Sequence, residues 1–143
     1  MLLHIPPFVT GWGGFLRAVR TELALPYRLR ELAICAVGAL TGCAYELQQH
    51  RPEFLRAGGS AAQFAALADG IRASNDDGLF DATERAVLRL VVEMTQGGAA
   101  RAEAVTAACA APPDDQQAVE LVGVIAAYNM VARFINTLDI QPE

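Results

Sequence analysis

Residues 25–50 read LPYRLRELAICAVGALTGCAYELQQH, a stretch that carries the signals of two consecutive helices. Pro26 is placed to open the first helix, because proline is tolerated in a first helical turn. The pair Thr41-Gly42 interrupts the pattern, and a second helix is predicted over about 43–57, before the stop signal Gly58-Gly59. Between Pro26 and the interruption, an apolar face recurs at helical spacing: Leu29, Leu32, Ala33, Ala36, Val37 and Leu40.

The rest of the chain carries helical signals of the same kind. Alanine, the best helix former, is abundant, and no long stretch alternates apolar and polar residues as a strand would. Capping boxes, Ser60 with Gln63 and Asp81 with Glu84, mark two further helix starts. We therefore predict an all-α fold, a single domain over residues 1–143 with about six helices. Its remaining helices are expected at about 11–23, 60–73, 81–97 and 115–138, with a weaker one at 99–110, an irregular entry at 1–9 and a break at Pro112-Pro113.

The composition is that of a globular protein and excludes several classes. The 143 residues are 53% hydrophobic and 19% charged, which is too apolar for a disordered chain. The formal net charge is −5 and all 11 basic residues are arginine, so nucleic acid and anionic membrane surfaces are poor partners. The longest apolar run, residues 121–132, is shorter than the ~20 residues that a membrane span needs.

The three cysteines, Cys35, Cys43 and Cys109, are too few and too scattered for a disulfide framework or a metal finger. A reducing compartment is their simplest context. The N-terminus lacks the basic start and the cleavage site of a signal peptide. We expect a cytoplasmic protein of bacterial type that uses no metal and no cofactor.

One segment gathers the reactive side chains. Cys43, Glu46 and His50 are spaced i, i+3 and i+7, which places them on one face of a helix. A cysteine in a first helical turn is favoured as a thiolate, whereas the nearby Glu46 carboxylate raises the pKa of the thiol. Glu31, on the preceding helix, could fold back onto this face and orient the imidazole or act as a base.

The same residues also have structural interpretations. A free cysteine is more often a small buried hydrophobe than a nucleophile. A lone histidine on a helix is usually just hydrogen-bonded. Pro52 is expected to kink or restart the helix just after His50, which would turn the imidazole away from Cys43. Near the N-terminus, Phe8, Trp12 and Phe15 are expected to be packing residues that could roof a pocket.

Three segments together resemble the carboxymuconolactone decarboxylase family, which includes the alkylhydroperoxidase D proteins. They are residues 25–34 (LPYRLRELAI), 41–50 (TGCAYELQQH) and 128–136 (YNMVARFIN). The resemblance is collinear over most of the chain. It implies an all-helical fold that assembles into homo-oligomers, often trimers or hexamers.

The resemblance also implies roles for individual residues. In the hydroperoxidase branch, a glutamate on the preceding helix, a Cys-x-x-Cys pair and a histidine four residues later form a proton relay and a redox pair. Glu31, Cys43 and His50 match the glutamate, the first cysteine and the histidine. Glu46 stands where the second cysteine should be, so the resemblance is to a branch of the family with Cys-x-x-Glu in place of Cys-x-x-Cys. A two-cysteine cycle fits poorly, while a one-cysteine cycle, in which Cys43 is rescued by an outside thiol, stays open.

The decarboxylase branch suits Glu46 better. Its reaction removes a carboxyl group from a small anionic lactone, and a histidine with carboxylates of raised pKa could transfer the proton that this needs. Candidate catalytic residues are therefore Glu31, Cys43, Glu46 and His50.

An anionic substrate also needs a cation, and a guanidinium binds a carboxylate through a bidentate fork. Arg30, Arg133 and Tyr45 are the candidate substrate-binding residues, with Arg28 and Arg51 as alternatives. Three functions remain open: a decarboxylase-like enzyme acting on a small acid or lactone, a thiol peroxidase using Cys43, and a non-catalytic helical oligomer that binds a small hydrophobic acid or a partner protein.

Overall fold

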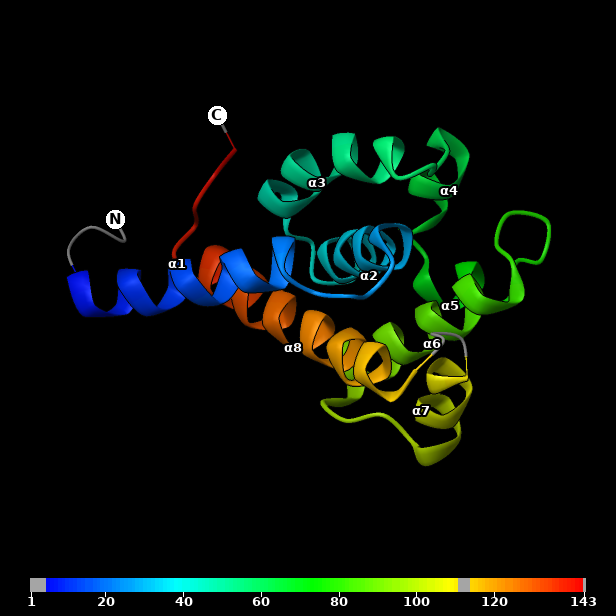
Figure 1. Cartoon of the computed structure of the whole chain (residues 1–143). Coiled ribbons are helices and arrows are strands. Elements are labelled where there is room, and N and C mark those ends of the chain that lie inside the picture. Colours follow the sequence, from blue (N-terminus) through cyan, green and yellow to red (C-terminus); the bar gives the residue numbers. More distant parts are fainter. Residues whose placement is uncertain (1–4, 111–113, 143) are drawn as a thin grey trace.

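The structure, a computed structural model, describes residues 5–110 and 114–142. These residues form eight α-helices and no strand, as Figure 1 shows. The all-α prediction is therefore confirmed, with more helices than the six expected. In chain order the helices are α1 (Pro6–Thr21), α2 (Tyr27–Leu40), α3 (Ala44–Arg56), α4 (Ala61–Ala66), α5 (Gly70–Ala73), α6 (Ala82–Gly97), α7 (Ala102–Cys109) and α8 (Asp115–Thr137).

Two of the predicted helices were wrong in their bounds. The irregular entry over 1–9 does not extend past Ile5, because Pro6 stands in the first turn of α1, where the fixed φ of a proline ring suits a helix. The single helix expected over 60–73 is two short helices, since Asp69 accepts a hydrogen bond from the backbone N–H of Arg72 and starts α5 afresh. Residues 1–4 and the expected break at Pro112-Pro113 lie outside the described residues.

Other predicted signals are present as expected. Both capping boxes form, at the N-termini of α4 and α6. In each, the side chain of the N-cap residue accepts the backbone N–H three residues on, and that residue's side chain accepts in return. Gly98 ends α6 in the left-handed conformation, with φ of 77°.

Helix α2 is the central element of the fold. It packs against α3 on one side and against α6 and α8 on the other (Figure 1). Every residue from Leu32 to Gly38 is buried, so the helix has no solvent-facing side over this span. Burial of each large apolar side chain here contributes about 1.5–3 kcal/mol.

A tight turn reverses the chain between α2 and α3. Gly42 has φ of 64°, a left-handed conformation that glycine adopts at little cost. The backbone N–H of Cys43 donates to the carbonyl of Gly38 at 2.9 Å, which closes the turn. Helix α3 therefore lies back along α2, and this brings the first turn of α2 beside the middle of α3.

Helices α1 and α8 lie side by side at the edge of the fold (Figure 1). Leu16 and Val19 are the buried residues of α1. Further along, the Trp12 ring contacts Phe134 of α8, with ring centroids 5.0 Å apart.

Helix α8 is long and apolar enough to cross a membrane by length and composition alone. The apolar part of this helix is thus longer than the run of residues 121–132 on which the sequence analysis judged it too short for a membrane span. However, 56% of its most apolar window is buried inside the fold, which is the pattern of a core helix. Its apolar character is accounted for by packing against α2, α6 and α7.

Candidate functional site

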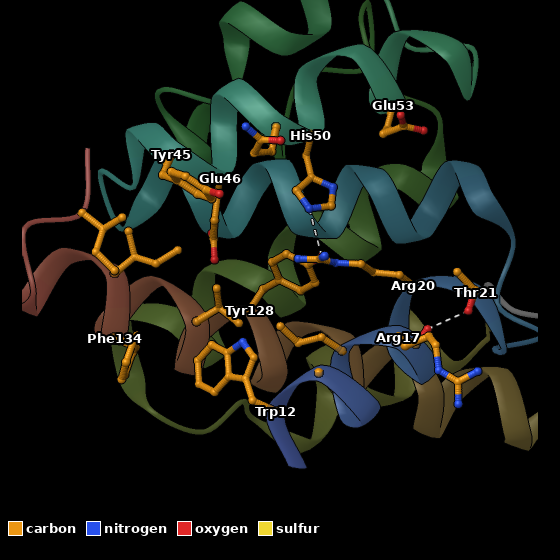
Figure 2. A pocket seen from close by; sticks show the side chains of 16 residues that line it. Trp12, Arg17, Arg20, Thr21, Tyr45, Glu46, His50, Glu53, Tyr128 and Phe134 are labelled. Carbon is orange, nitrogen blue, oxygen red and sulfur yellow. Dashed lines mark hydrogen bonds between the residues drawn. The ribbon is translucent and has the colours of Figure 1, made fainter. Parts of the chain in front are cut away.

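A cavity of about 670 Å³ opens between α1, α3 and α8 (Figure 2). Its volume falls within the range of small-molecule sites. Apolar and aromatic side chains make most of its wall, and polar groups reach it from α3 and from the second half of α1. The lining residues are Trp12, Gly13, Leu16, Arg17, Arg20, Thr21, Tyr45, Glu46, Gln49, His50, Glu53, Tyr128, Val131, Phe134, Ile135 and Ile140.

Four helices contribute to one hydrogen-bonded chain at this cavity. The Glu31 carboxylate on α2 lies 2.8 Å from Nδ1 of His50 on α3. Nε2 of His50 lies 2.9 Å from the hydroxyl of Tyr128 on α8. Nε of Arg20 on α1 donates to the same hydroxyl, also at 2.9 Å. The imidazole is thus held at both ring nitrogens, and Figure 2 shows it pointing from α3 toward Tyr128 and Arg20.

The partners define how protons are arranged along this chain. An ionised carboxylate can only accept, so Nδ1 of His50 donates to Glu31. Arg20 donates to the Tyr128 oxygen, which leaves the Tyr128 hydroxyl to donate to Nε2. Burial raises the pKa of Tyr128 to about 12, while Arg20 acts in the opposite direction. The phenol therefore stays protonated at neutral pH and keeps its place as the donor to His50.

Glu46 differs from the other polar residues of the cavity. Its residue exposure is 2%, and neither carboxyl oxygen has a hydrogen-bond partner among the described residues. Burial raises its pKa from 4.5 to about 8, with Arg20 opposing the shift. An isolated buried carboxylate is costly, so the group is kept as the neutral acid at pH 7. In Figure 2 its carboxyl end points across the cavity, away from α3.

Cys43 lies behind the cavity wall and is not among the residues that line it. Its side chain is fully buried in a small apolar cluster with Leu16, Val131, Ala132 and Ile135. Burial raises the pKa of the thiol, although the backbone N–H groups of Glu46 and Tyr45 lower it. The expected helix-terminus effect is therefore present, but desolvation outweighs it, and the expectation that Cys43 lines the site is wrong.

The other cysteines supply no partner for Cys43. All three cysteines are free. Cys35 is buried in the main core around α2, and burial strongly raises the pKa of its thiol. Among the described residues, no group of three or more histidine, cysteine, aspartate and glutamate side chains is arranged to hold a metal ion.

The candidate substrate-binding residues divide between the cavity and the rest of the surface. Tyr45 lines the cavity, as Figure 2 shows. Arg30 does not, because its guanidinium turns to Glu31, with Nε 3.3 Å from the carboxylate, and lies over the Tyr27 ring. Arg133 is exposed on α8 and also lies outside the cavity.

The alternatives Arg28 and Arg51 are also absent from the cavity lining. Arg28 forms a salt bridge of 2.6 Å with Glu84, and Arg51 lies over the Phe64 ring. The sequence analysis did not identify the two arginines that line the cavity, Arg17 and Arg20, or Tyr128 as a partner of His50. Tyr128 stands first in the quoted segment 128–136, which was a usable signal. Nothing near Arg20 marked it, because α1 carries no recognisable motif.

Pro52 does not turn the imidazole out of the site. Helix α3 runs without a break from Ala44 to Arg56, with Pro52 exposed inside it. His50 is buried and faces Glu31 and Tyr128 instead of Cys43. The predicted restart of the helix at this point was wrong.

The fold and the cavity together define an all-helical protein with a buried carboxyl–imidazole site. The family model of the carboxymuconolactone decarboxylase family matches residues 6–77, which is half of the chain. The chain belongs to this family. The matched region contains Glu31, Cys43, Glu46 and His50, whereas Tyr128 lies beyond it.

Two crystal structures are similar over nearly the whole chain. One is a protein of unknown function from Agrobacterium tumefaciens, described as a candidate antioxidant defence protein, AhpD. It is 19% identical, with a TM-score of 0.83 over 99% of this chain and 94% of that one. The other is an uncharacterised peroxidase-related protein from a Silicibacter species. It is 18% identical, with a TM-score of 0.78 over 94% of this chain and 69% of that one. At this identity the similarities establish the fold alone. No curated protein matches the sequence.

Proposed function

We propose that this protein is a small-molecule enzyme that transfers a proton on a small organic acid or lactone, with Glu46 as the acid. The observation that carries the proposal is the buried carboxyl of Glu46, which faces the cavity with both oxygens unpartnered. Both oxygens are shielded from solvent in the cavity wall, and no described protein group holds the proton of the acid. Its pKa of about 8 keeps the acid protonated at neutral pH, and a general acid is most effective when its pKa lies near the pH of the reaction.

The proposed chemistry is the proton transfer that completes a decarboxylation. The bond between the α-carbon and the carboxylate breaks, carbon dioxide leaves, and the electron pair remains on carbon as a carbanion or enolate. Glu46 then gives its proton to that carbon and regains one from water. A general acid placed in this way contributes typically 10²–10⁴-fold to the rate.

The chain from Glu31 to Arg20 supports this step by position and charge. His50 is held at both nitrogens, so the Tyr128 hydroxyl has a fixed direction. Arg20 brings a positive charge to the cavity wall beside Tyr128. Fixed donors and charges of this kind stabilise the negative charge that develops on a reacting substrate.

The peroxidase hypothesis receives no support from the geometry. A one-cysteine peroxidase needs a thiolate that a peroxide can reach. Cys43 is buried, its pKa is raised, and it lies outside the cavity lining. The proposal therefore gives Cys43 a packing role.

We further propose that the protein works in the cytoplasm as a homo-oligomer, a trimer or a hexamer. Its partner is a small-molecule substrate, and neither nucleic acid nor a membrane.

Deuterium incorporation tests the proposal. The protein is incubated in D₂O with a panel of small carboxylated lactones, oxo acids and, separately, organic peroxides, and the products are followed by NMR. Wild-type protein is expected to release carbon dioxide and to place deuterium on the former α-carbon. Glu46→Gln is expected to lose about a hundredfold or more of this activity, and Cys43→Ala to keep most of it. The opposite pattern, with peroxide consumption that Cys43→Ala abolishes, would overturn the proposal. No turnover of any compound would favour the non-catalytic oligomer.

A further inference from the structure

The charged side chains that line the cavity differ in whether they have a partner of opposite charge, and this difference bears on which ligands the cavity can bind. Two of the charged side chains that line the cavity are already paired within the protein. Arg17 forms a salt bridge of 2.9 Å with Glu22. Glu53 pairs with Arg56 and with the Tyr27 hydroxyl at the cavity edge. These groups are compensated before any ligand arrives.

Arg20 is different, because it is exposed at the cavity and has no acidic partner among the described residues. A guanidinium has five N–H donors. In this structure only Nε of Arg20 donates, to the Tyr128 hydroxyl, and the terminal nitrogens make no hydrogen bond to any described residue. The guanidinium also lies over the Tyr128 ring, 5.9 Å from its centroid. Arg20 is thus held in place by Tyr128 while its fork remains open to a ligand.

The position of Arg20 is fixed by the helix that carries it. Leu16, one turn earlier on α1, is buried together with Val19 against the core. These contacts set the face of α1 that meets α8, and Arg20 follows on that face at the cavity. A cation that is positioned in advance loses little conformational freedom when it binds an anion.

The opposite part of the wall is apolar. Trp12 and Phe134 lie in contact, and Val131, Ile135 and Leu16 continue the surface. Figure 2 shows Trp12 and Phe134 on the far side of the cavity from Glu46 and His50. A ring or a branched alkyl group would remove this surface from water. A second charge placed there would lose its hydration with no counter-ion to replace it.

We propose that the cavity selects apolar monocarboxylates of about ring size: Arg20 binds the single carboxylate, and Trp12 and Phe134 cover the apolar body. This assignment rests on the proposed function for the location of the substrate, and it narrows the substrate class. Dicarboxylates are excluded by it, because Arg17, the other arginine of the lining, is paired with Glu22, and the wall around Trp12 and Phe134 is apolar.

Calorimetric binding of unreactive probes tests the assignment without turnover. The probes are 4-oxocyclohexanecarboxylate, its neutral carboxamide, and cyclohexane-1,4-dicarboxylate. Wild-type protein is expected to bind the monocarboxylate about tenfold or more tightly than either of the others, since hydrogen bonds to charged groups are the strong ones. This comparison needs no variant and so does not depend on the folding of one.

Two arginine variants then locate the anion. Arg20→Gln is expected to weaken binding of the monocarboxylate by about tenfold or more, and Arg20→Lys by less, because it keeps the charge but loses the fork. Arg133→Gln removes the same charge outside the cavity and is expected to leave the affinity unchanged. Equal affinity for the acid and the carboxamide, an unchanged affinity in folded Arg20→Gln, or no binding of the monocarboxylate at about 10 mM would overturn the assignment. Turnover that depends on Glu46 could still be found in that case, so the proposed function would stand or fall separately.

Discussion

Glu46 is the residue on which the chemistry of the cavity depends, because its environment decides its charge. The helix period brings Glu46 and His50 to one side of α3, and this much follows from spacing. The sequence spacing does not predict that the carboxyl oxygens lack a partner, because this depends on the side chains that α1 and α8 contribute to the cavity. The contact between Glu31 and His50 was expected as one option, and the structure has it at 2.8 Å.

The raised pKa of Glu46 predicts a stability effect with a definite sign. Folded Glu46 holds its proton up to about pH 8, whereas in the unfolded chain the group ionises near its ordinary value of 4.5. The unfolded state therefore binds fewer protons between these values, and the free energy of unfolding falls as pH rises through this window. The loss approaches about 1.4 kcal/mol per pH unit.

Glu46→Gln has no ionisable group at this position, so its free energy of unfolding is expected not to fall in this way. Chemical denaturation of both proteins from pH 4 to pH 9 gives the difference in free energy of unfolding, variant minus wild type. This difference is expected to increase between about pH 4.5 and pH 8 and to level off above pH 8. Parallel curves for the two proteins would show that Glu46 titrates alike in the folded and unfolded chains.

Tyr128→Phe tests the hydrogen-bonded chain. Phenylalanine keeps the edge-on ring contact with His50, whose centroid lies 5.0 Å away, and removes only the hydroxyl. The buried Nε2 then loses its donor, which is expected to lower the free energy of unfolding by about 1–3 kcal/mol. Nitrogen-15 NMR of the imidazole is expected to show the Nδ1–H tautomer in the wild type and a weaker preference in the variant. Identical spectra would contradict the assigned partners.

At the scale of elements, the sequence was informative wherever a local signal decides the outcome. The capping boxes and the turn at Gly42 depend on a few adjacent residues, and they were predictable from them. The division of 60–73 into two helices was not, because Asp69 acts as a cap only in the conformation that the fold gives it. The continuity of α3 through Pro52 likewise reflects tertiary packing, which overrides the local preference.

Two glycines are expected to respond to alanine in opposite directions. A Cβ at Gly59 would overlap the Phe54 ring, so Gly59→Ala is expected to destabilise the protein by about 1–3 kcal/mol. Gly14 lies inside α1 with open space around the Cβ position, so Gly14→Ala is expected to stabilise it by about 0.5–1 kcal/mol. Thermal melts of the two variants measure the contrast, and shifts in the same direction would contradict the packing described for the end of α3.

At the scale of the whole molecule, the cavity exists only because distant segments meet. Arg20 and Tyr128 are 108 residues apart in sequence and share a hydrogen bond. Periodicity places residues on a helix face but does not say which faces will meet, so the arginine of the site escaped prediction. The family, in contrast, was predicted correctly from motifs such as those in residues 25–50, because each motif consists of residues that are adjacent in the sequence.

The resemblance also implies assembly. Several large apolar side chains are exposed on α1 and α8, among them Phe8, Phe15, Val119 and Met130. Such surfaces are commonly covered by a partner. Light scattering after size-exclusion chromatography is expected to give a mass of three or six times the 15.2 kDa protomer. A mass equal to one protomer at every concentration would contradict this expectation.

Titration of the Glu46 carboxyl carbon tests the account most directly. Carbon-13 NMR of protein labelled at glutamate side chains, with Glu46→Gln to assign the signal, reports the protonation of this group alone. The account predicts a midpoint near pH 8, with the acid protonated at neutral pH. A midpoint near the ordinary value of 4.5 would mean that Glu46 is a carboxylate in the working protein, and it would remove the proposed proton donor from the cavity.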